Sequence, residues 1–216
     1  MASNDQPSVP IQSESTRVKN LFLTRYRGDA IEKSIYLMSS EMSMAFRKHF
    51  DGMSRSLFYI RYYSKALKNQ ALEYELEAAV MTLLQEALAK ISTKNTLVDQ
   101  VIKQHQVKIK HGKQGHQIQA SIIDPLANHY LELMVAADEV VRKYTALWLA
   151  LVINDQQKRQ SVNEVIASVR ELHAQCTRIS LGLRDRCSPH NPSSTPRVDD
   201  AGEVEFVDEN STGLAA

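Results

Sequence analysis

Apolar residues recur at spacings of three and four along most of the chain, which is the period of an amphipathic α-helix. The first series predicts a helix that begins at a capping box formed by Asp29 and Glu32 and ends near Gly52. Its apolar positions are Ile31, Ile35, Met38, Met42, Ala45, Phe46 and Phe50. A second helical region follows over about residues 54–91, with a break near Ser64 left open, and a shorter helix covers about residues 95–103.

A long helical pair is predicted in the C-terminal half. Asp124 and Pro125 form a helix start, with Asp as the N-cap and Pro at the first helical position. The apolar stripe that follows is Leu126, Tyr130, Leu133, Met134, Ala137, Val140, Val141, Tyr144, Leu147, Trp148 and Leu151. A turn at Asn154 and Asp155 leads to a last helix, with Ser161 and Glu164 as its capping box. Because the connection is short, we expect the two helices to pack antiparallel.

Two short segments change to the period of two that is typical of a β-strand. Residues 105–110 alternate, and residues 116–122 alternate again after a loop at 111–115. In the second segment Ile118, Ala120 and Ile122 are expected to point inward. Gln117, Gln119 and Ser121 are then expected to point outward. Residues 18–26 are rich in aromatic and aliphatic side chains and form a further candidate strand.

The spacing of Gly and Pro excludes a β-rich fold, because residues 53–111 and 126–181 contain neither residue. No apolar stretch reaches the roughly 18 residues of a membrane span. The two cysteines, Cys176 and Cys187, are too few for a disulfide scaffold and suit a reduced cytoplasm. We therefore expect a cytoplasmic, mainly α-helical protein with one or two short strands.

Charge is distributed unevenly along the chain. Residues 197–216 hold six acidic residues and one basic residue, and residues 1–16 carry a net charge of −2. The intervening residues 17–196 then have a net charge of +8, although the whole chain is at +1. We expect a disordered arm at 1–16, a helical domain at 17–184 and a disordered acidic tail at 185–216.

Catalytic and metal-binding patterns are weak, and neither an enzyme nor a cofactor is expected. Cys176 lies on the apolar stripe of the last helix, where a buried structural thiol is favoured over a nucleophile. His105, His111 and His116 are clustered but lack the spacing of a zinc site, so a solvated basic loop is favoured. No small-molecule substrate is indicated.

The basic residues point to a nucleic acid. Residues 100–123 contain no acidic residue but include Lys103, Lys108, Lys110 and Lys113. Residues 52–72 also lack acids and interleave basic residues with aromatic ones, namely Arg55, Phe58, Tyr59, Arg61, Tyr62, Tyr63, Lys65 and Lys68. Basic and aromatic side chains together suit a phosphate backbone and exposed bases, although an amphipathic helix with aromatic core residues explains this second stretch equally well.

The order strand, helix, helix over residues 116–183 is that of ribbon-helix-helix proteins. In such proteins strands from two copies pair into an antiparallel ribbon that enters the major groove of double-stranded DNA. Gln117, Gln119 and Ser121 would then contact base edges. Lys108, Lys110, Lys113, Lys158 and Arg159 would contact phosphates. A structural hairpin between residues 105–110 and 117–122 explains the same alternation without DNA.

Three segments within about residues 17–184 carry a resemblance to a known family. They are VKNLFLTRY, QIQASIIDPLANHYLELMVAADEVVRKYTALWLAL with its DEVVR stretch at 138–142, and RELHAQCTRISLGLR. In these segments the chain resembles the AcaB-like regulators of conjugative plasmids and integrating conjugative elements. It implies a homodimeric ribbon-helix-helix regulator that acts on promoters of transfer genes. The two long helices and the large helical region before them depart from a minimal ribbon-helix-helix protein, so residues 17–27 compete with 116–122 as the ribbon strand.

The resulting hypothesis is a sequence-specific DNA-binding regulator without enzymatic activity. The alternative is a non-enzymatic helical interaction protein of a mobile-element transfer apparatus, whose basic face contacts an acidic protein.

Overall fold

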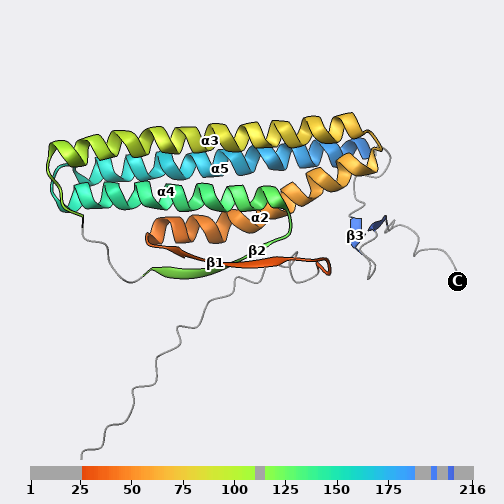
Figure 1. Cartoon of the computed structure of the whole chain (residues 1–216), viewed down its shortest axis with the longest axis horizontal. Helices are drawn as coiled ribbons and strands as arrows, with labels where there is room; N and C mark the ends of the chain where they lie inside the picture. Colours follow the sequence, from red (N-terminus) through yellow and green to blue (C-terminus); the bar gives the residue numbers. More distant parts are fainter. Residues whose placement is uncertain (1–25, 110–114, 188–195, 199–203, 207–216) are drawn as a thin grey trace, which may run out of the picture.

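Four long helices form the body of the protein in the computed structural model, which describes residues 26–109, 115–187, 196–198 and 204–206. They are α2 (Ser40–Ala66), α3 (Gln70–Gln104), α4 (Pro125–Leu149) and α5 (Asp155–Cys187). Figure 1 shows the four helices lying lengthwise beside one another, and every pair of them is in contact. None of the helices in these ranges is long and apolar enough to cross a membrane.

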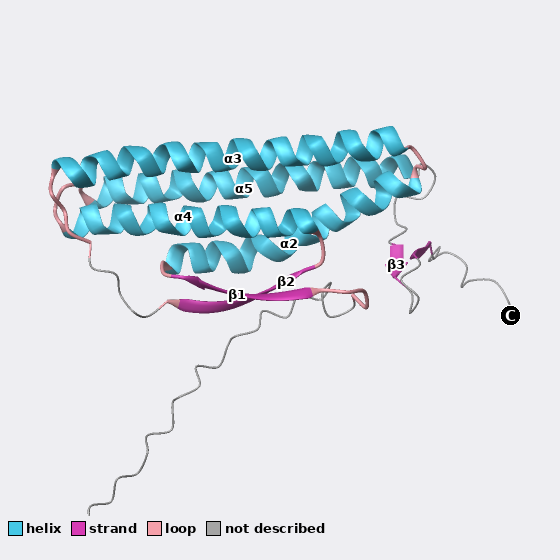
Figure 2. Ribbon diagram, in the orientation of Figure 1, coloured by secondary structure: helices cyan, strands magenta, loops and turns pink. Residues whose placement is uncertain are grey.

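A two-stranded antiparallel ribbon covers one side of the bundle (Figure 2). It consists of β1 (Ile31–Leu37) and β2 (His116–Ile122), with Ile31 opposite Ile122 and Leu37 opposite His116. The inward side chains of Ile35, Leu37, Ala120 and Ile122 are buried in the same core as the helices. The ribbon contacts α2 and α4. A mainly helical fold with a short antiparallel sheet is therefore confirmed.

The predicted helix from Asp29 to Gly52 is wrong at both ends. Residues 31–37 form β1 instead, and the helix begins after Ser39, whose hydroxyl accepts a hydrogen bond from the Met42 amide. The apolar residues of 31–37 fit either period, since Ile31 and Ile35 are four apart and also lie on one face of a strand. Pairing with β2 selects the strand.

The helix also passes through Gly52 and ends at Ala66. Glycine inside a helix costs about 1 kcal/mol relative to alanine. Here it allows α5 to approach closely, because a Cβ at Gly52 would lie 2.7 Å from Nε2 of His173. The second helical region breaks at Leu67–Asn69, just after Ser64, where Lys68 adopts a positive φ of 51°. Residues 95–103 belong to α3 rather than to a separate helix.

The structural hairpin is also wrong. Residues 105–109 form a turn and an irregular segment, and β2 pairs with β1 instead. The alternation at 116–122 is confirmed as β2, and Asp124 caps α4 as predicted, with Pro125 in the first turn. The candidate strand at 18–26 lies outside the described residues except for Tyr26, which is in no regular element.

The last helix begins at Asp155, six residues before the predicted Ser161 cap. Its capping box is formed by Asn154 and Gln157, since each side chain accepts a hydrogen bond from the backbone N–H of the other residue. The helix extends to Cys187, and β3 (Pro196–Val198) pairs with β4 (Val204–Phe206). These elements lie in the segment expected to lack structure from residue 185; the rest of that segment, and the arm at 1–16, lie outside the described residues.

Candidate nucleic-acid interface

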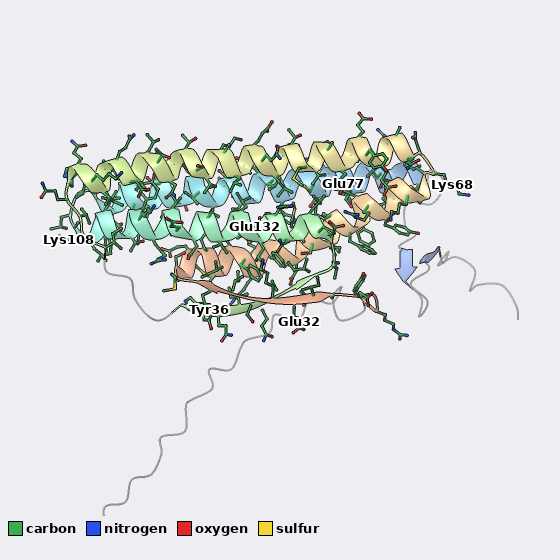
Figure 3. The ribbon with its side chains drawn as sticks, viewed as in Figure 1. Glu32, Tyr36, Lys68, Glu77, Lys108 and Glu132 are labelled. Atoms are coloured by element: carbon green, nitrogen blue, oxygen red, sulfur yellow. The ribbon has the colours of Figure 1, made fainter. Side chains whose placement is uncertain are left out.

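The outer face of the β1–β2 ribbon is the surface on which the predicted base-contacting residues lie. Gln117 is opposite Tyr36, Gln119 is opposite Ser34, and Ser121 is opposite Glu32. Gln117 and Gln119 are exposed and Ser121 is half-buried. Figure 3 shows Glu32 and Tyr36 pointing away from the helices. The structure therefore gathers the three predicted residues on one face, together with three β1 residues that the sequence analysis missed.

The missed residues Glu32, Ser34 and Tyr36 carried a detectable signal. They alternate with Ile31, Lys33, Ile35 and Leu37, which is the period of a strand. The outer face of the ribbon is polar apart from the ring of Tyr36, which is 59% exposed. Lys33 lies on the inner side, where its ammonium group donates a hydrogen bond of 3.0 Å to Oδ1 of Asn128 in α4.

Two buried carboxylates fix the ribbon to the bundle. Asp138 of α4 accepts hydrogen bonds from the backbone N–H groups of Met38 and Ser39, at 2.8 and 2.9 Å, where β1 turns into α2. Asp124 accepts from the Leu126 amide at the start of α4 and from Nε of Arg61 in α2, the latter at 2.7 Å. Each strand is therefore held where it meets a helix.

The predicted phosphate-contacting residues lie in different settings. Lys108 is exposed at the end of the bundle where α3 finishes (Figure 3). Lys110 and Lys113 lie outside the described residues. The ammonium group of Lys158 lies 4.6 Å from the centre of the Trp148 ring and 3.9 Å from Glu41, so it is partly engaged within the chain. Arg159 is exposed and pairs with Asp155 one turn earlier at 2.8 Å.

The basic and aromatic stretch at residues 52–72 is mostly structural. Tyr63 is buried, and burial raises its pKa well above the ordinary value. Tyr59 and Tyr62 are half-buried and pack against the core. Arg61 is held by Asp124 and also lies 3.5 Å from Glu77. The amphipathic-helix interpretation explains these residues, whereas Arg55, Lys65 and Lys68 remain exposed.

The structure also shows where the candidate chemical groups lie. Cys176 is fully buried, and burial raises the pKa of its thiol to about 12, so almost no thiolate forms at neutral pH. His105 and His116 are exposed, and His111 lies outside the described residues. Among the described residues, no three His, Cys, Asp or Glu side chains are grouped closely enough to hold a metal ion.

One cluster of polar and charged residues was not anticipated from the sequence. Nδ1 of His49 in α2 lies 3.3 Å from Nδ1 of His173 in α5, within the interface of the two helices. Burial is the largest cause that lowers the pKa of each imidazole. The pKa of His49 is lowered further by His173 and then by the positive charges of Lys48 and Arg170, and the pKa of His173 by Arg55. Helical spacing on two separate helices gives no signal for such a pair.

The chain matches no protein-family model and no curated protein. Its fold is similar to that of a solved structure, the selenomethionine-containing AcaB from uropathogenic E. coli, with a TM-score of 0.70. The match covers 77% of this chain and 92% of that chain, at 14% sequence identity. At this identity the likeness concerns the fold alone, and the chain has an AcaB-like fold.

Proposed function

We propose that the protein is a DNA-binding transcriptional regulator without enzymatic activity, which places the outer face of the β1–β2 ribbon in the major groove. The observation that carries the proposal is an exposed polar face on a two-stranded antiparallel ribbon. The major groove is about 12 Å wide and accepts such a ribbon. Both strands come from one chain, so a complete ribbon needs no strand from a second copy.

The side chains on this face suit base edges. The side-chain amide of Gln117 or Gln119 can donate through its NH₂ group to N7 of adenine and accept through its oxygen from the N6 amino group of the same base. Ser121 and Ser34 can act as donor or acceptor. Glu32 can accept only, which suits the N4 amino group of cytosine. The arrangement favours sequence-dependent contacts over contacts with phosphate.

Phosphate contacts are proposed for Lys108, Lys110, Lys113, Lys158 and Arg159. Removing a phosphate contact lowers affinity for all sequences alike and reduces the slope of log affinity against log salt by about 1. Lys158 and Arg159 have contacts within the chain, so they would have to exchange these contacts for a phosphate. Lys108→Ala is therefore the cleanest of the described lysines to test.

A homodimer is part of the proposal. Within the described residues β2 pairs with β1 along one edge only. A second copy could therefore pair along the other edge and extend the ribbon across a two-fold axis, because strand edges present unpaired backbone groups. Light scattering on the purified full chain measures the mass directly, and a monomer at micromolar concentration in the presence of DNA would contradict this part.

A role in conjugative transfer is proposed from the resemblance to AcaB-like regulators. The match to AcaB concerns the fold alone, so the role in transfer needs its own test. DNA fragments selected by the full chain from a random library would give a preferred site, and the position of that site relative to transfer genes would test the role.

We expect Gln119→Ala to weaken binding to the selected site by about 1–3 kcal/mol and to relax the preference at one base pair, because a bidentate contact is lost. The matched control is Gln85→Ala, which removes an exposed glutamine from α3, away from the ribbon. Fluorescence anisotropy at fixed salt measures both variants. Equal affinities for Gln119→Ala and the wild type would exclude the outer face as the reading surface.

A second function is favoured by one aromatic residue of the outer face. The ring of Tyr36 is 59% exposed there, and exposed tyrosine side chains are enriched in protein-binding surfaces. In this alternative the protein is a non-enzymatic interaction protein of a transfer apparatus. No measurable binding of the full chain to any duplex at physiological salt would favour it over DNA binding.

A further inference from the structure

Helix α3 has a long solvent-facing side that no other described element covers. Its buried residues repeat at heptad spacing and are Val80, Leu84, Ala87, Ile91 and Val98. The positions farthest from them around the helix recur every seven residues, and all five are exposed: Glu75, Thr82, Ala89, Thr96 and Lys103. Exposed neighbours complete what we call the α3 outer face, namely Ala78, Ala79, Gln85, Glu86, Ser92, Thr93 and Gln100. Figure 1 shows α3 on the side of the bundle opposite the β1–β2 ribbon.

The middle of the α3 outer face is suited to burial against a partner. Between residues 78 and 100, Glu86 is its one charged member. Leu88, Lys90 and Leu97 lie at its borders, and the two leucines are 44% and 54% exposed. Three threonine hydroxyls donate to carbonyl groups one turn earlier in α3, at 2.9 to 3.1 Å, and belong to Thr82, Thr93 and Thr96. A partner that covers these hydroxyls therefore leaves none of them without a hydrogen bond.

The two ends of the α3 outer face carry opposite charges. Residues 70–87 contain four glutamates and no basic residue, whereas residues 88–104 contain three lysines and one aspartate. Glu75 and Lys103 are the charged residues at the ends of the face. Both are exposed, and within the described residues no ion pair joins either of them to another side chain. A partner therefore meets an acidic end and a basic end.

These two charges are placed symmetrically about Ala89. Glu75 lies 14 residues before Ala89 and Lys103 lies 14 residues after it, which is about 21 Å along the helix in each direction. When two α3 helices pack antiparallel with Ala89 at the crossing point, Glu75 of each copy lies opposite Lys103 of the other. Thr82 then lies opposite Thr96. One two-fold axis at Ala89 therefore pairs the charges at both ends of the contact.

A second copy of the chain is the occupant that fits this pattern of charge. A nucleic acid or an anionic membrane presents one sign of charge, so it would be repelled by the acidic end of α3. A parallel second copy would place glutamates opposite glutamates and lysines opposite lysines. An antiparallel copy is complementary at both ends, with uncharged residues meeting in between.

We propose that the α3 outer face is a homodimer interface, in which the α3 helices of two copies pack antiparallel about a two-fold axis at Ala89. The two ribbons then lie on the outer sides of the dimer, away from the contact (Figure 1). The interface is distinct from the free ribbon edge discussed above, and both contacts can form in one assembly because they use opposite sides of the bundle. The proposal does not depend on DNA binding.

Charge reversal at the two ends tests the antiparallel pairing in the full chain. Glu75→Lys places lysines opposite each other at both ends of the dimer, and Lys103→Glu places glutamates opposite each other. We expect each variant to self-associate about tenfold more weakly than the wild type at low salt, measured by sedimentation equilibrium without DNA. An equimolar mixture of the two variants should associate as the wild type does, because each chain then meets opposite charges at both ends.

The matched controls are Glu171→Lys and Arg178→Glu, which make the same changes in charge at exposed positions of α5. Each should associate as the wild type does, and mixing them should bring no gain. The double variant Glu75→Lys, Lys103→Glu restores complementarity within one chain and should also associate like the wild type. All of these positions are exposed, so the variants should fold. The proposal fails if the mixture of Glu75→Lys and Lys103→Glu associates no better than either variant alone.

A cysteine at the axis locates the interface directly. Ala89→Cys places two thiols opposite each other, so a short thiol-specific cross-linker should convert most of the full chain to a covalent dimer. The controls are Gln175→Cys, at an exposed position of α5, and the wild type, whose own cysteines are Cys176 and Cys187. Both controls should give much less covalent dimer.

The outcomes separate this interface from the proposed function. A dimer by mass that Ala89→Cys does not cross-link, and whose affinity Glu75→Lys does not change, overturns the α3 interface and leaves the ribbon edge as the contact. A chain that stays monomeric at every concentration without DNA also overturns the α3 interface. Neither result bears on contacts between the ribbon and base edges, which Gln119→Ala tests separately.

Discussion

Asp138 illustrates how one buried side chain determines the position of the ribbon. Its carboxylate accepts hydrogen bonds from two consecutive backbone N–H groups and from the hydroxyl of Ser39. Only 4% of Asp138 is exposed, so water cannot replace these bonds. The residue belongs to the DEVVR stretch at 138–142 on which the resemblance to AcaB-like regulators partly rests. Its position explains why that stretch has an acidic residue on a buried helix face.

We expect Asp138→Ala to lower the free energy of unfolding by about 3 kcal/mol, because the backbone N–H groups of Met38 and Ser39 and the Ser39 hydroxyl all lose their acceptor. Urea unfolding of the full chain measures the change. The control is Asp185→Ala, which removes an exposed carboxylate beside Arg184 and should change the stability by less than about 0.5 kcal/mol. A loss for Asp138→Ala that is no larger than for the control would contradict the anchoring role.

The His49–His173 pair gives the folded protein a stability that depends on pH. Burial lowers the pKa of both imidazoles below the ordinary 6.5, so the unfolded chain binds more protons than the folded chain as the pH falls below that value. We expect the contribution of this pair to the free energy of unfolding to be fully present above about pH 6.5. It should decrease as the pH falls from there through the lowered pKa values of the folded protein.

Urea unfolding at a series of pH values in phosphate-free buffer tests this. The double variant His49→Gln, His173→Gln should show a flatter decrease between about pH 6.5 and pH 5. His129→Gln, which removes an exposed histidine on α4, serves as the control. If the free energy of unfolding falls with the same slope against pH in the double variant and the wild type, the histidine pair is not the source of the pH dependence.

At the scale of elements, α2 shows how packing overrides a local preference. Gly52 and the polar Ser54, Ser56 and Ser64 lie inside a helix of 27 residues, although glycine favours a helix end. All three serines are buried, and the hydroxyls of Ser56 and Ser64 donate hydrogen bonds to carbonyl groups of α2 itself. The contact of α2 with α5 stabilises the helix across Gly52, because that contact requires a residue without a side chain.

Gly52→Ala tests this at the helix interface. Alanine is the better helix former by about 1 kcal/mol, yet we expect the variant to be destabilised by about 1–2 kcal/mol because the methyl group displaces the His173 ring. In a His173→Ala background the same substitution should instead stabilise the protein. Thermal unfolding of the four proteins of the cycle gives the coupling free energy. An identical effect of Gly52→Ala in both backgrounds would exclude the contact with His173.

At the scale of the whole molecule, the charge of the chain is separated along the sequence. Residues 17–196 carry a net charge of +8, and residues 197–216 carry −5. Several basic residues of 17–196 form ion pairs between helices. Examples are Lys94–Glu164, which connects α3 to α5, and Lys143–Asp99, which connects α4 to α3. Others, such as Arg55, Lys108 and Arg170, are exposed and remain available for an anionic partner.

We expect deletion of residues 197–216 to raise the affinity for non-specific DNA, because an acidic segment competes with DNA for the same cations. Anisotropy titrations at low and at physiological salt measure the effect, which should be larger at low salt. A control chain of the same length, in which the six acidic residues of 197–216 are replaced by Asn or Gln, should behave like the deletion. Unchanged affinity at low salt would contradict this competition and favour a segment that serves solubility alone.

The sequence by itself determined the elements whose signals are local. The sequence predicts the start of α4 from Asp124 and Pro125, the strand β2 from the alternation at 116–122, and the buried face of α4 from its apolar stripe. Each of these signals depends only on neighbouring residues. Only the tertiary structure decided the rest. Residues 31–37 satisfy both periods, and they form a strand because β2, 79 or more residues further along the chain, pairs with them. Long-range packing also stabilises α2 across Gly52 and places Tyr36 and Ser34 opposite the two glutamines. It brings His49 into contact with His173 as well. Contacts between distant segments leave no periodic pattern in either segment, so the sequence alone does not predict them.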